Sequence, residues 1–503
     1  MFKEMQIEVL TGSITVQKAE ALIVNLFEGV TTPAGATGAV DAALGGQISR
    51  VVAGGDFKGK VDETAVLYPD GKIPAARVIV AGLGKREKFT YDIVRKVAAT
   101  AAKKARDLGA TVIHTVVHGA GVGGLDIEKA AQAVTEGTIL GLYRFRELKT
   151  EKDDRSDVHC LVFVEQDVAK VQAIERGAKA GQVVAESACF ARDLANLPAN
   201  VLTPERMAEI ASNMAGITGL TAKVLDETEI AQLGMNAYMS VARGSHHPPR
   251  FIVLEHNAGT ADLPCVALVG KAVTFDSGGI SLKPGEGMEA MKGDMAGGAA
   301  VLGAMRAIAL LGLPLRVIGL VPATENMPGG GASKPGDVVK ALMGLTIEII
   351  STDAEGRLCL ADALTYAREW KPEAIFDIAT LTGACSVALG SQAAGAMGDQ
   401  RLLDVLVEAG DATGERVWPL PLFEEYDEQI KSDVADVKNS GGRPAGALTA
   451  GRFLRKFVPG GIPWAHIDMA GMSREDKGRP YIPKGATGYG VRLFVELLRN
   501  WEK

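Results

Sequence analysis

The stretch ARVIVAGLGKREKFTYDIVRKVAATAAKKARDLGATVIHTVVHG, residues 76–119, decides the fold class of this chain. Residues 76–84 and 111–119 are short apolar runs rich in valine and isoleucine, which is typical of buried strands. Residues 91–110 have a helical pattern that ends at Gly109, where a C-terminal helix cap belongs. A strand, a helix and a second strand in this order predict an α/β layer structure.

The alternation of strands and helices continues along the chain. Residues 125–145 predict a second helix, residues 159–166 a further strand, and residues 168–194 a long helix that can join two domains. Later short apolar runs, with helical segments between several of them, predict the strands of a second α/β domain: FIVLEH (251–256), PCVALVG (264–270), LRVIGLVP (315–322), TIEII (346–350) and AIFDIATL (374–381).

The domain boundaries follow from these patterns and from one charged segment. Most residues of RFRELKTEKDDRSD (144–157) are charged, which predicts a solvated connector. A chain of 503 residues has room for two or three domains. We expect a smaller N-terminal α/β domain (1–165), a linker helix (166–191) and a larger C-terminal α/β domain (192–503).

Composition and charge narrow the class of protein. Hydrophobic residues make up 47% of the chain and charged residues 23%, which is ordinary for a globular protein, and the net charge of −7 argues against a chain built mainly to bind nucleic acid. The five cysteines are scattered and never form CxxC, so we expect buried thiols in a reducing compartment. The start MFKEMQIEVL lacks the apolar run of a signal peptide. These features predict a cytoplasmic protein.

One apolar segment invites a membrane interpretation. AMRAIALLGLPLRVIGLVPA (304–323) is interrupted by Arg306, Pro314 and Arg316, which predicts a helix, a turn and a strand instead of a membrane span. We therefore expect no membrane partner.

Gly119, Gly121 and Gly124 form GxGxxG after a predicted strand and before a predicted helix, the order found in dinucleotide-binding proteins. In those proteins an acid about 20 residues further on closes a second strand. Arg146 and Glu147 stand at that distance here, inside the charged connector. A tight strand–helix turn is therefore the preferred interpretation, with nucleotide binding as the alternative.

The segment ISTDAEGRLCLADAL (350–364) places charges directly after an apolar run. Asp353, Glu355 and Arg357 occupy every second position, and in an extended chain such side chains leave on one face. Two acids on one face repel each other unless a positive charge lies between them. A metal ion, a substrate cation or an ion pair with Arg357 would each serve.

Similar charges occur upstream, at strand ends and helix starts. Lys271 follows a buried strand, Asp276 and Lys283 flank a glycine turn, and Asp294 opens a helix. Taken singly, Asp294 is typical of a helix cap, the lysines of solvated side chains and Asp276 of a turn. Taken together, they lie where α/β sheets bind ligands.

The four acids supply enough oxygens for two metal ions about 3.5–4 Å apart. The histidines are consistent with a carboxylate site, since none of the seven lies in an HExxH motif. A metal site in this chain would be built mostly from carboxylates, which suits hard or borderline divalent ions.

Three segments resemble signatures of the leucyl aminopeptidase family, also called cytosol aminopeptidases: VGKAVTFDSGGISLKPGEGM (269–288), MKGDMAGGAA (291–300) and STDAEGRL (351–358), the last very close to that family's NTDAEGRL. Further similar segments occur in the same order as in the family: ARDLANLPANVLTP (191–204), ATENMPGG (323–330), IATLTGAC (378–385), SDVADVKNSGGRPAGALTA (432–450) and WAHIDMAG (464–471). The resemblance covers the C-terminal domain strongly, and the N-terminal domain only in size and rhythm.

The resemblance implies a metal-dependent aminopeptidase that removes leucine-like N-terminal residues from peptides by attack of a metal-bridging water. It implies a larger domain with a mixed, mostly parallel sheet and a homo-hexamer. The expected cofactors are two divalent metal ions per subunit, Zn²⁺ or Mn²⁺ with Mg²⁺ or Co²⁺ as alternatives, and bicarbonate.

The resemblance also assigns five metal ligands. Asp276 and Glu355 would bridge the two ions. Lys271 in its neutral form and Asp294 would complete one metal site, and Asp353 the other.

Two further residues are expected to be catalytic. Lys283 would polarise the scissile carbonyl, and Arg357 would hold the bicarbonate that acts as general base, helped by the backbone amides of Gly356 and Leu381. The resemblance places four residues around the first substrate side chain: Met291, Thr380, Gly383 and Ala470. Ser351 stands where most relatives have asparagine, which bears on substrate preference.

Two other functions stay open at this point. A binding protein that has lost activity would lack at least one of the seven ligand and catalytic residues, and all seven are present. Some bacterial relatives also bind DNA, so a DNA-binding regulatory role is the alternative function. The N-terminal domain has basic residues that could form a local patch for it: Lys85, Arg86, Lys88, Lys103, Lys104 and Arg106.

Overall fold

The computed structural model describes residues 4–121, 123–151, 156–260 and 262–501. The chain folds as two compact units, and both are α/β. The first contains Met1–Cys189 and a late segment, Lys477–Lys484; the second contains Phe190–Asp476 and Gly485–Lys503. A smaller N-terminal domain and a larger C-terminal one are therefore confirmed. The exact boundaries at 165 and 191 stay a prediction, since helix α5 runs unbroken from Val168 to Asn196.

The first unit is built on a six-stranded sheet with the order β1-β6-β5-β2-β4-β3. All neighbouring strands are parallel except β3 and β4. Their bounds are β1 Gln6–Thr11, β2 Ala21–Leu26, β3 Thr64–Leu67, β4 Val78–Gly82, β5 Val112–Thr115 and β6 Cys160–Glu165. The strands predicted from the apolar runs at 76–84, 111–119 and 159–166 are thus confirmed.

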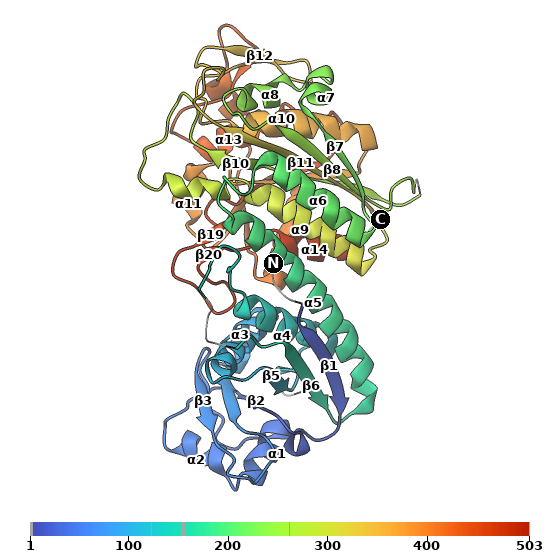
Figure 1. Cartoon of the computed structure of the whole chain (residues 1–503), viewed down its shortest axis with the longest axis vertical. Helices are drawn as coiled ribbons and strands as arrows, with labels where there is room; N and C mark the ends of the chain where they lie inside the picture. The colour runs from blue at the N-terminus through green and yellow to red at the C-terminus, as the bar shows by residue number, and fades with distance from the viewer. Residues whose placement is uncertain (1–3, 122, 152–155, 261, 502–503) are drawn as a thin grey trace. The chain divides into compact units, whose positions relative to one another are not determined.

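Helices cover both faces of this sheet (Figure 1). Side chains of α1 and α2 pack on Leu22 and Val24 of β2 and on Val78 and Val80 of β4, and α3 and α4 pack together with α3 against β4. The helices and 3-10 turns are η1 Ile14–Val16, α1 Gly35–Ala43, α2 Gln47–Ala53, η2 Arg86–Lys88, α3 Tyr91–Asp107, α4 Ile127–Leu142 and α5 Val168–Asn196. The charged connector at 144–157 lies partly outside the described residues.

The late segment Lys477–Lys484 adds contacts to the first unit. The Tyr481 hydroxyl donates a hydrogen bond of 2.5 Å to Asp92 Oδ1 in α3. The carbonyl oxygen of Pro480 lies beside Gly141 of α4, 3.3 Å from where a β-carbon would stand. The first unit therefore includes residues from near the end of the chain.

The second unit has a mixed, mostly parallel sheet, as expected. Its order is β16-β15-β18-β14-β9-β11-β8-β7, with β10 paired to β11; the pairs β15–β18, β11–β8 and β7–β8 are antiparallel. The bounds are β7 Thr221–Leu225, β8 Arg250–His256, β9 Cys265–Gly270, β10 Ala272–Asp276, β11 Arg316–Asn326, β14 Ala374–Ala379, β15 Ala394–Gly398, β16 Val417–Pro419 and β18 Trp464–Asp468.

Two layers of helices enclose this sheet. Figure 1 shows α6, α9 and α14 on one side of it and α8, α10 and α13 on the other. The helices and 3-10 turns are α6 Pro204–Thr218, α7 Glu227–Gln232, α8 Asn236–Ala242, η3 Met288–Gly293, α9 Ala296–Leu311, α10 Gly356–Tyr366, η4 Ala367–Trp370, α11 Gly383–Leu389, α12 Gln400–Thr413, η5 Glu424–Ile430, α13 Gly446–Arg455 and α14 Val491–Arg499. Two small sheets complete the unit. One contains β12 Val338–Lys340, β13 Thr346–Glu348 and β17 Val437–Lys438, and the other contains β19 Arg474–Glu475 and β20 Gly485–Ala486.

The helical segment Met288–Leu311, which contains η3 and α9, is long and apolar enough to cross a membrane. However, 78% of its most apolar window is buried inside the protein, where α9 packs on β9, β11 and β14. The predicted break after this helix is confirmed, since a turn at Gly312 leads into β11. The segment is a core helix.

The close packing of α3 on α4 generates a stability prediction. A β-carbon at Gly137 of α4 would lie 2.2 Å from the Arg95 carbonyl oxygen, so Gly137→Ala must push the two helices apart. We expect it to lower the free energy of unfolding by about 1–3 kcal/mol, measured by urea denaturation.

Gly216→Ala is the matched control, because Gly216 also lies inside a helix but no atom of the described residues lies within 4 Å of where its β-carbon would stand. There the better helix propensity of alanine should raise stability by about 0.5–1 kcal/mol. Equal effects of the two substitutions would contradict the packing argument.

Candidate active site

Lys271 lies between β9 and β10, at the carboxyl end of a central strand of the second unit. Its backbone N–H donates to the Ile378 carbonyl of β14 at 3.1 Å, and its carbonyl accepts from the Gly298 N–H of α9 at 2.7 Å. A β-carbon at Gly297 would lie 2.3 Å from the Ile378 carbonyl oxygen. The glycines at the start of α9 therefore let this helix approach the strand ends and fix the position of Lys271.

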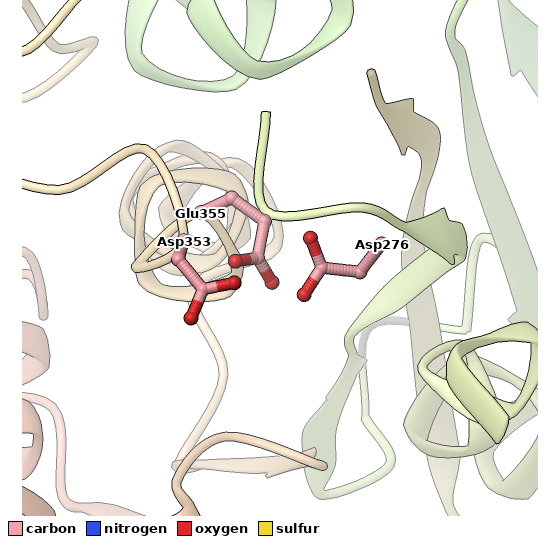
Figure 2. Close-up of side chains that lie close together, drawn as sticks. All are labelled: Asp276, Asp353 and Glu355. Carbon is pink, nitrogen blue, oxygen red and sulfur yellow. The ribbon is translucent and has the colours of Figure 1, made fainter. Parts of the chain in front are cut away.

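The expectation that residues 353–357 are extended is wrong. Strand β13 ends at Glu348, a turn includes Thr352 and Asp353, and Glu355 has helical dihedral angles at the N-cap of α10. The carboxylates nevertheless converge. One oxygen each from Asp276, Asp353 and Glu355 lies within 4.8 Å of the others, and Figure 2 shows the three groups turned toward one another. A turn and a helix start bring the acids together.

The helix-cap alternative for Asp294 is also wrong. The N-cap of α9 is Met295, which makes no side-chain cap. The Asp294 carboxylate instead accepts hydrogen bonds from Lys271 Nζ at 2.8 Å and from the Thr380 hydroxyl at 2.7 Å. Asp294 thus belongs to the carboxylate cluster.

Two lysines lie between the four carboxylates. Lys271 Nζ is 2.8 Å from Asp294 and 2.7 Å from Glu355. Lys283 Nζ is 2.8 Å from Asp276 and 2.5 Å from Asp353. The Lys271 side chain is only 3% exposed, whereas that of Lys283 is 22% exposed. The solvated alternative is therefore wrong for Lys271, and Lys283 lies at the open side of the cluster.

Burial and mutual repulsion shift the pKa values of this cluster. Burial raises the pKa of Asp294 well above its ordinary range, with Glu355 and Asp276 adding to it and Lys271 opposing. Burial and Glu355 likewise raise the pKa of Asp276. Burial alone would lower the pKa of Lys271, but Asp294 and Glu355 outweigh burial and raise it. Buried acids therefore outweigh the positive charges available to them.

The cluster fits divalent metal ions. Four carboxylates share two lysine charges, so the group is short of positive charge at the point where its oxygens converge. Carboxylate oxygens form a donor set that hard and borderline divalent ions accept, and Lys271 can add a nitrogen donor only after a bound cation has displaced its proton. Gly356 is needed beside it, since a β-carbon there would lie 2.5 Å from Cε of Lys271.

Arg357 occupies a separate position in the first turn of α10. Its Nη1 donates to the Asn439 carbonyl at 2.8 Å, and its buried Nε has no hydrogen-bond partner among the described residues. Burial lowers the pKa of Arg357 to about 10, while Glu355 and Asp468 act in the other direction. A buried guanidinium with a spare donor is suited to a small anion.

Three polar residues that the sequence interpretation did not assign hold the site together. Asn326 at the end of β11 donates to Asp276 Oδ1 at 2.8 Å and to the Thr352 carbonyl at 2.9 Å. Asn439 donates to the Ser351 carbonyl at 2.7 Å and accepts from the Ile350 N–H at 2.8 Å.

The third unassigned residue is Asp468 at the end of β18. One of its oxygens accepts from the N–H groups of Leu381 and Ala470 at 3.2 Å each, and the other accepts from the Thr382 hydroxyl at 2.6 Å. All three unassigned residues lie inside segments that resemble the family, which was the available signal.

Of the four residues predicted around the first substrate side chain, two are linked to the site by hydrogen bonds and two lie on neighbouring elements. Thr380 joins the ion-pair network directly, since its carbonyl also accepts from Lys271 Nζ at 3.0 Å, and Ala470 is held by Asp468. Met291 and Gly383 lie on neighbouring elements, η3 and the start of α11.

Two family models match this chain. The model for the catalytic domain of the cytosol aminopeptidase family matches residues 189–495, and the model for its N-terminal domain matches residues 23–152. The chain belongs to the cytosol aminopeptidase family.

Curated relatives support this membership over the full length. The chain is 49% identical over 471 residues to a probable cytosol aminopeptidase of Geotalea uraniireducens, covering 92% of this chain and 93% of the relative. It is 48% identical over 497 residues to one of Geobacter sulfurreducens, covering 98% and 99%.

Solved structures agree with this result. A mutant of tomato leucine aminopeptidase matches with a TM-score of 0.88 at 33% identity, covering 99% of this chain and 96% of that one. The bottromycin maturation enzyme BotP in complex with Mn matches with a TM-score of 0.85 at 35% identity, covering 96% and 99%.

The predicted family, fold and enzyme class are thereby confirmed. This member of the cytosol aminopeptidase family is a metal-dependent hydrolase that removes residues from the N-terminus of peptides.

Asn439→Ala tests how the site is held. It removes side-chain hydrogen bonds to the backbone at 350, 351 and 354, in a residue that is fully buried. We expect a loss of about 2–4 kcal/mol in stability, and weaker metal binding because the loop that carries Asp353 is released. Thermal unfolding and metal titration measure the two effects.

The control is Asn500→Ala, which removes only local contacts to Glu496 near the end of α14. That variant should match the parent enzyme in both measurements. Unchanged metal affinity in Asn439→Ala would contradict the positioning role.

Proposed function

We propose that this aminopeptidase prefers leucine-like N-terminal residues and works with two divalent metal ions per subunit, Zn²⁺ or Mn²⁺, with Mg²⁺ or Co²⁺ as alternatives. The ligands would be Lys271, Asp276, Asp294, Asp353 and Glu355. The observation that carries the proposal is the convergence of the Asp276, Asp353 and Glu355 carboxylates, to which Asp294 is joined through its ion pair with Lys271. When bound there, the ions supply Lewis-acid activation of a water molecule and of the scissile carbonyl.

Asp276 and Glu355 are the proposed bridging ligands. Both are almost completely buried, and Asn326 fixes the Asp276 carboxylate from the side opposite to Lys283 by bonding its other oxygen. A ligand held in this way keeps its orientation, which supports metal binding at a defined geometry.

Lys283 is the proposed electrophilic residue. Its ammonium group lies at the open side of the cluster, between Asp276 and Asp353. These carboxylates raise its pKa, although burial opposes them, so it stays charged at neutral pH. A fixed positive charge near the scissile carbonyl stabilises the oxyanion that forms during hydrolysis.

Arg357 is the proposed holder of bicarbonate. Its unpartnered Nε is one donor, and the N–H of Gly356, the first residue of α10, has no partner within its helix. The Leu381 N–H is engaged by Asp468 at 3.2 Å, so its share in binding the anion is smaller. Bicarbonate held there would act as the general base that accepts a proton from water.

Met291, Thr380, Gly383 and Ala470 are the proposed lining for the first substrate side chain. Asp468 links two parts of this lining, because its carboxylate accepts hydrogen bonds from the backbone N–H groups of Leu381, Thr382 and Ala470. Ser351 lies in the same loop as Asp353 and accepts a hydrogen bond from the Asp353 N–H at 3.3 Å.

We propose a cytoplasmic location and a homo-hexamer, both in line with the family resemblance. The DNA-binding alternative receives no support. Of the basic residues considered for it, Arg106 is buried and bonded to Asp107, and burial of Lys103 lowers its pKa. Arg106 and Lys103 therefore contribute less positive charge to the surface of α3 than the sequence suggested.

Metal removal tests the proposed function. Leucine-p-nitroanilide should be hydrolysed before chelation, not after it, and again when Zn²⁺ or Mn²⁺ is restored, because the carboxylate cluster activates water only with its ions. N-acetyl-leucine-p-nitroanilide should resist hydrolysis under all conditions, since it lacks a free α-amino group. Chelator-resistant hydrolysis would refute the assignment.

Glu355→Ala and Arg357→Ala separate metal binding from proton transfer. Glu355→Ala should abolish turnover and reduce metal content, whereas Arg357→Ala should slow turnover with metal content intact. Activity assays and elemental analysis of the purified variants measure both properties.

Glu369→Ala, an exposed position outside the site, is the control and should behave like the parent enzyme. Metal loss from Arg357→Ala, or full activity of Glu355→Ala, would show that the roles are assigned wrongly.

A further inference from the structure

The first unit contains a cavity of about 460 Å³ that the aminopeptidase reaction does not use. It lies at the carboxyl ends of the parallel strands, where β1, β2, β5 and β6 end. Its walls include Asn25 and Leu26 at the end of β2, Phe27 directly after it, and Val116 and Val117 after β5. A cavity of this size is typical of sites for small organic ligands.

The cavity lies at a topological switch point of the sheet. Strand β2 pairs with β4 on one side and with β5 on the other, and the chain passes from β2 toward β4 before it returns to β5. Connections that leave neighbouring strands in opposite directions open a crevice at their carboxyl ends, and α/β proteins bind ligands there.

Two glycines of the GxGxxG motif, Gly119 and Gly121, line this crevice together with Gly123. Gly119 and Gly121 have positive φ angles of 86° and 83°, which confirms the predicted tight turn. A β-carbon at Gly119 would lie 2.5 Å from the Phe89 ring, and one at Gly123 would lie 2.5 Å from the Gly119 carbonyl oxygen. Glycine is thus required for this loop to present its backbone to the cavity.

Two helices start near this crevice, and their N-termini differ in charge. The α4 N-terminus is capped by the Asp126 carboxylate, which accepts from the Lys129 N–H at 3.0 Å. An anion is therefore repelled at the position where dinucleotide-binding proteins hold their pyrophosphate. This agrees with the position of Glu147, which lies in the charged connector and not at the end of a second strand, and it disfavours a dinucleotide.

The α1 N-terminus, in contrast, lines the cavity and is open to an anion. Its N-cap Ala34 has no side-chain cap, and its first turn contains no acid. Ala34, Gly35 and Ala36 all lie in the cavity wall, and the first N–H groups of a helix have no partner within it. The Thr37 hydroxyl binds the Asn25 carbonyl at 2.7 Å and so fixes this turn to the end of β2.

The remaining walls are largely apolar. Leu26, Phe27, Leu83, Val116 and Val164 face the same space. The Asn25 amide is fixed by His118 at 2.8 Å, and burial lowers the pKa of His118 to about 4, so the imidazole is neutral.

Two charged residues complete the wall of the cavity. The Glu165 carboxylate accepts from the Asp167 N–H at 2.9 Å, and Lys170 lies 3.4 Å from Asp167. The charge of Glu165 is thus partly engaged outside the cavity, and that of Lys170 is paired at its rim.

We propose that this cavity binds a small organic phosphate of mononucleotide size. The phosphate would lie at the uncapped N-terminus of α1, where helix N–H groups and the helix dipole favour negative charge. The ring would lie against the apolar wall formed by Leu26, Leu83 and Val116.

The test is calorimetric titration of the full-length enzyme with AMP, ribose 5-phosphate, inorganic phosphate and adenosine. Saturable binding of one AMP per chain, tighter than that of adenosine, is expected. Ala34→Asp installs a helix cap and a negative charge at the phosphate position, so it should weaken AMP binding at least about tenfold, or 1.4 kcal/mol, without loss of stability.

Thr90→Asp is the matched control, since it adds the same charge at the N-cap of α3, outside the cavity wall. It should bind AMP like the parent enzyme, and both variants should hydrolyse leucine-p-nitroanilide normally. No saturable AMP binding at millimolar concentration overturns the proposal. So does equal binding by Ala34→Asp, or adenosine binding as tightly as AMP.

Discussion

Three buried carboxylates and the more exposed Asp353 lie close together in the second unit and repel one another, and much of the surrounding structure compensates for this repulsion. Burial strengthens it, because the protein interior screens charge less than water does. Burial raises the pKa values of Asp276 and Asp294, repulsion by Glu355 adds to this effect, and the lysines offset only part of it. Further positive charge beside such a cluster would favour its fully ionised form. The metal dependence of the family is thus consistent with the electrostatics of this part of the fold.

The backbone around the cluster is correspondingly well anchored. Asn326, Asn439 and Asp468 carry no proposed role in chemistry, yet each binds several backbone or side-chain groups of the site. Glycines contribute by allowing close packing of the backbone. Because Gly297 and Gly356 have no β-carbon, α9 can approach the strand ends and α10 can approach the side chain of Lys271. Polar anchors and close backbone approach together hold the acids at short separations.

The sequence was sufficient for the elements and for the members of the cluster. Apolar runs marked the buried strands, and charges placed directly after them marked the ligand end of the sheet. It was not sufficient for the path of residues 350–355, which turn instead of extending, because that path depends on hydrogen bonds from Asn439, more than 80 residues away. Asp294 was ambiguous for a similar reason: whether an acid caps its own helix or faces a distant lysine is decided by tertiary packing.

The GxGxxG motif shows a further limit of local patterns. The turn it forms was predictable from its glycines, but the cavity beside it is completed by α1 and by the end of β2, about 90 residues earlier in the chain. The charge at the start of each helix, and not the motif, distinguishes one kind of ligand from another. Such charges are readable in a sequence only after the fold has shown which helix faces the crevice.

The inclusion of Lys477–Lys484 in the first unit has a consequence for synthesis of the protein. Domains generally fold in the order in which they leave the ribosome. Here the hydroxyl of Tyr481 reaches Asp92 only after nearly the whole polypeptide has been made. The first domain to emerge is therefore the last to be finished, and a truncated chain that ends before residue 477 carries an N-terminal domain without its final contacts.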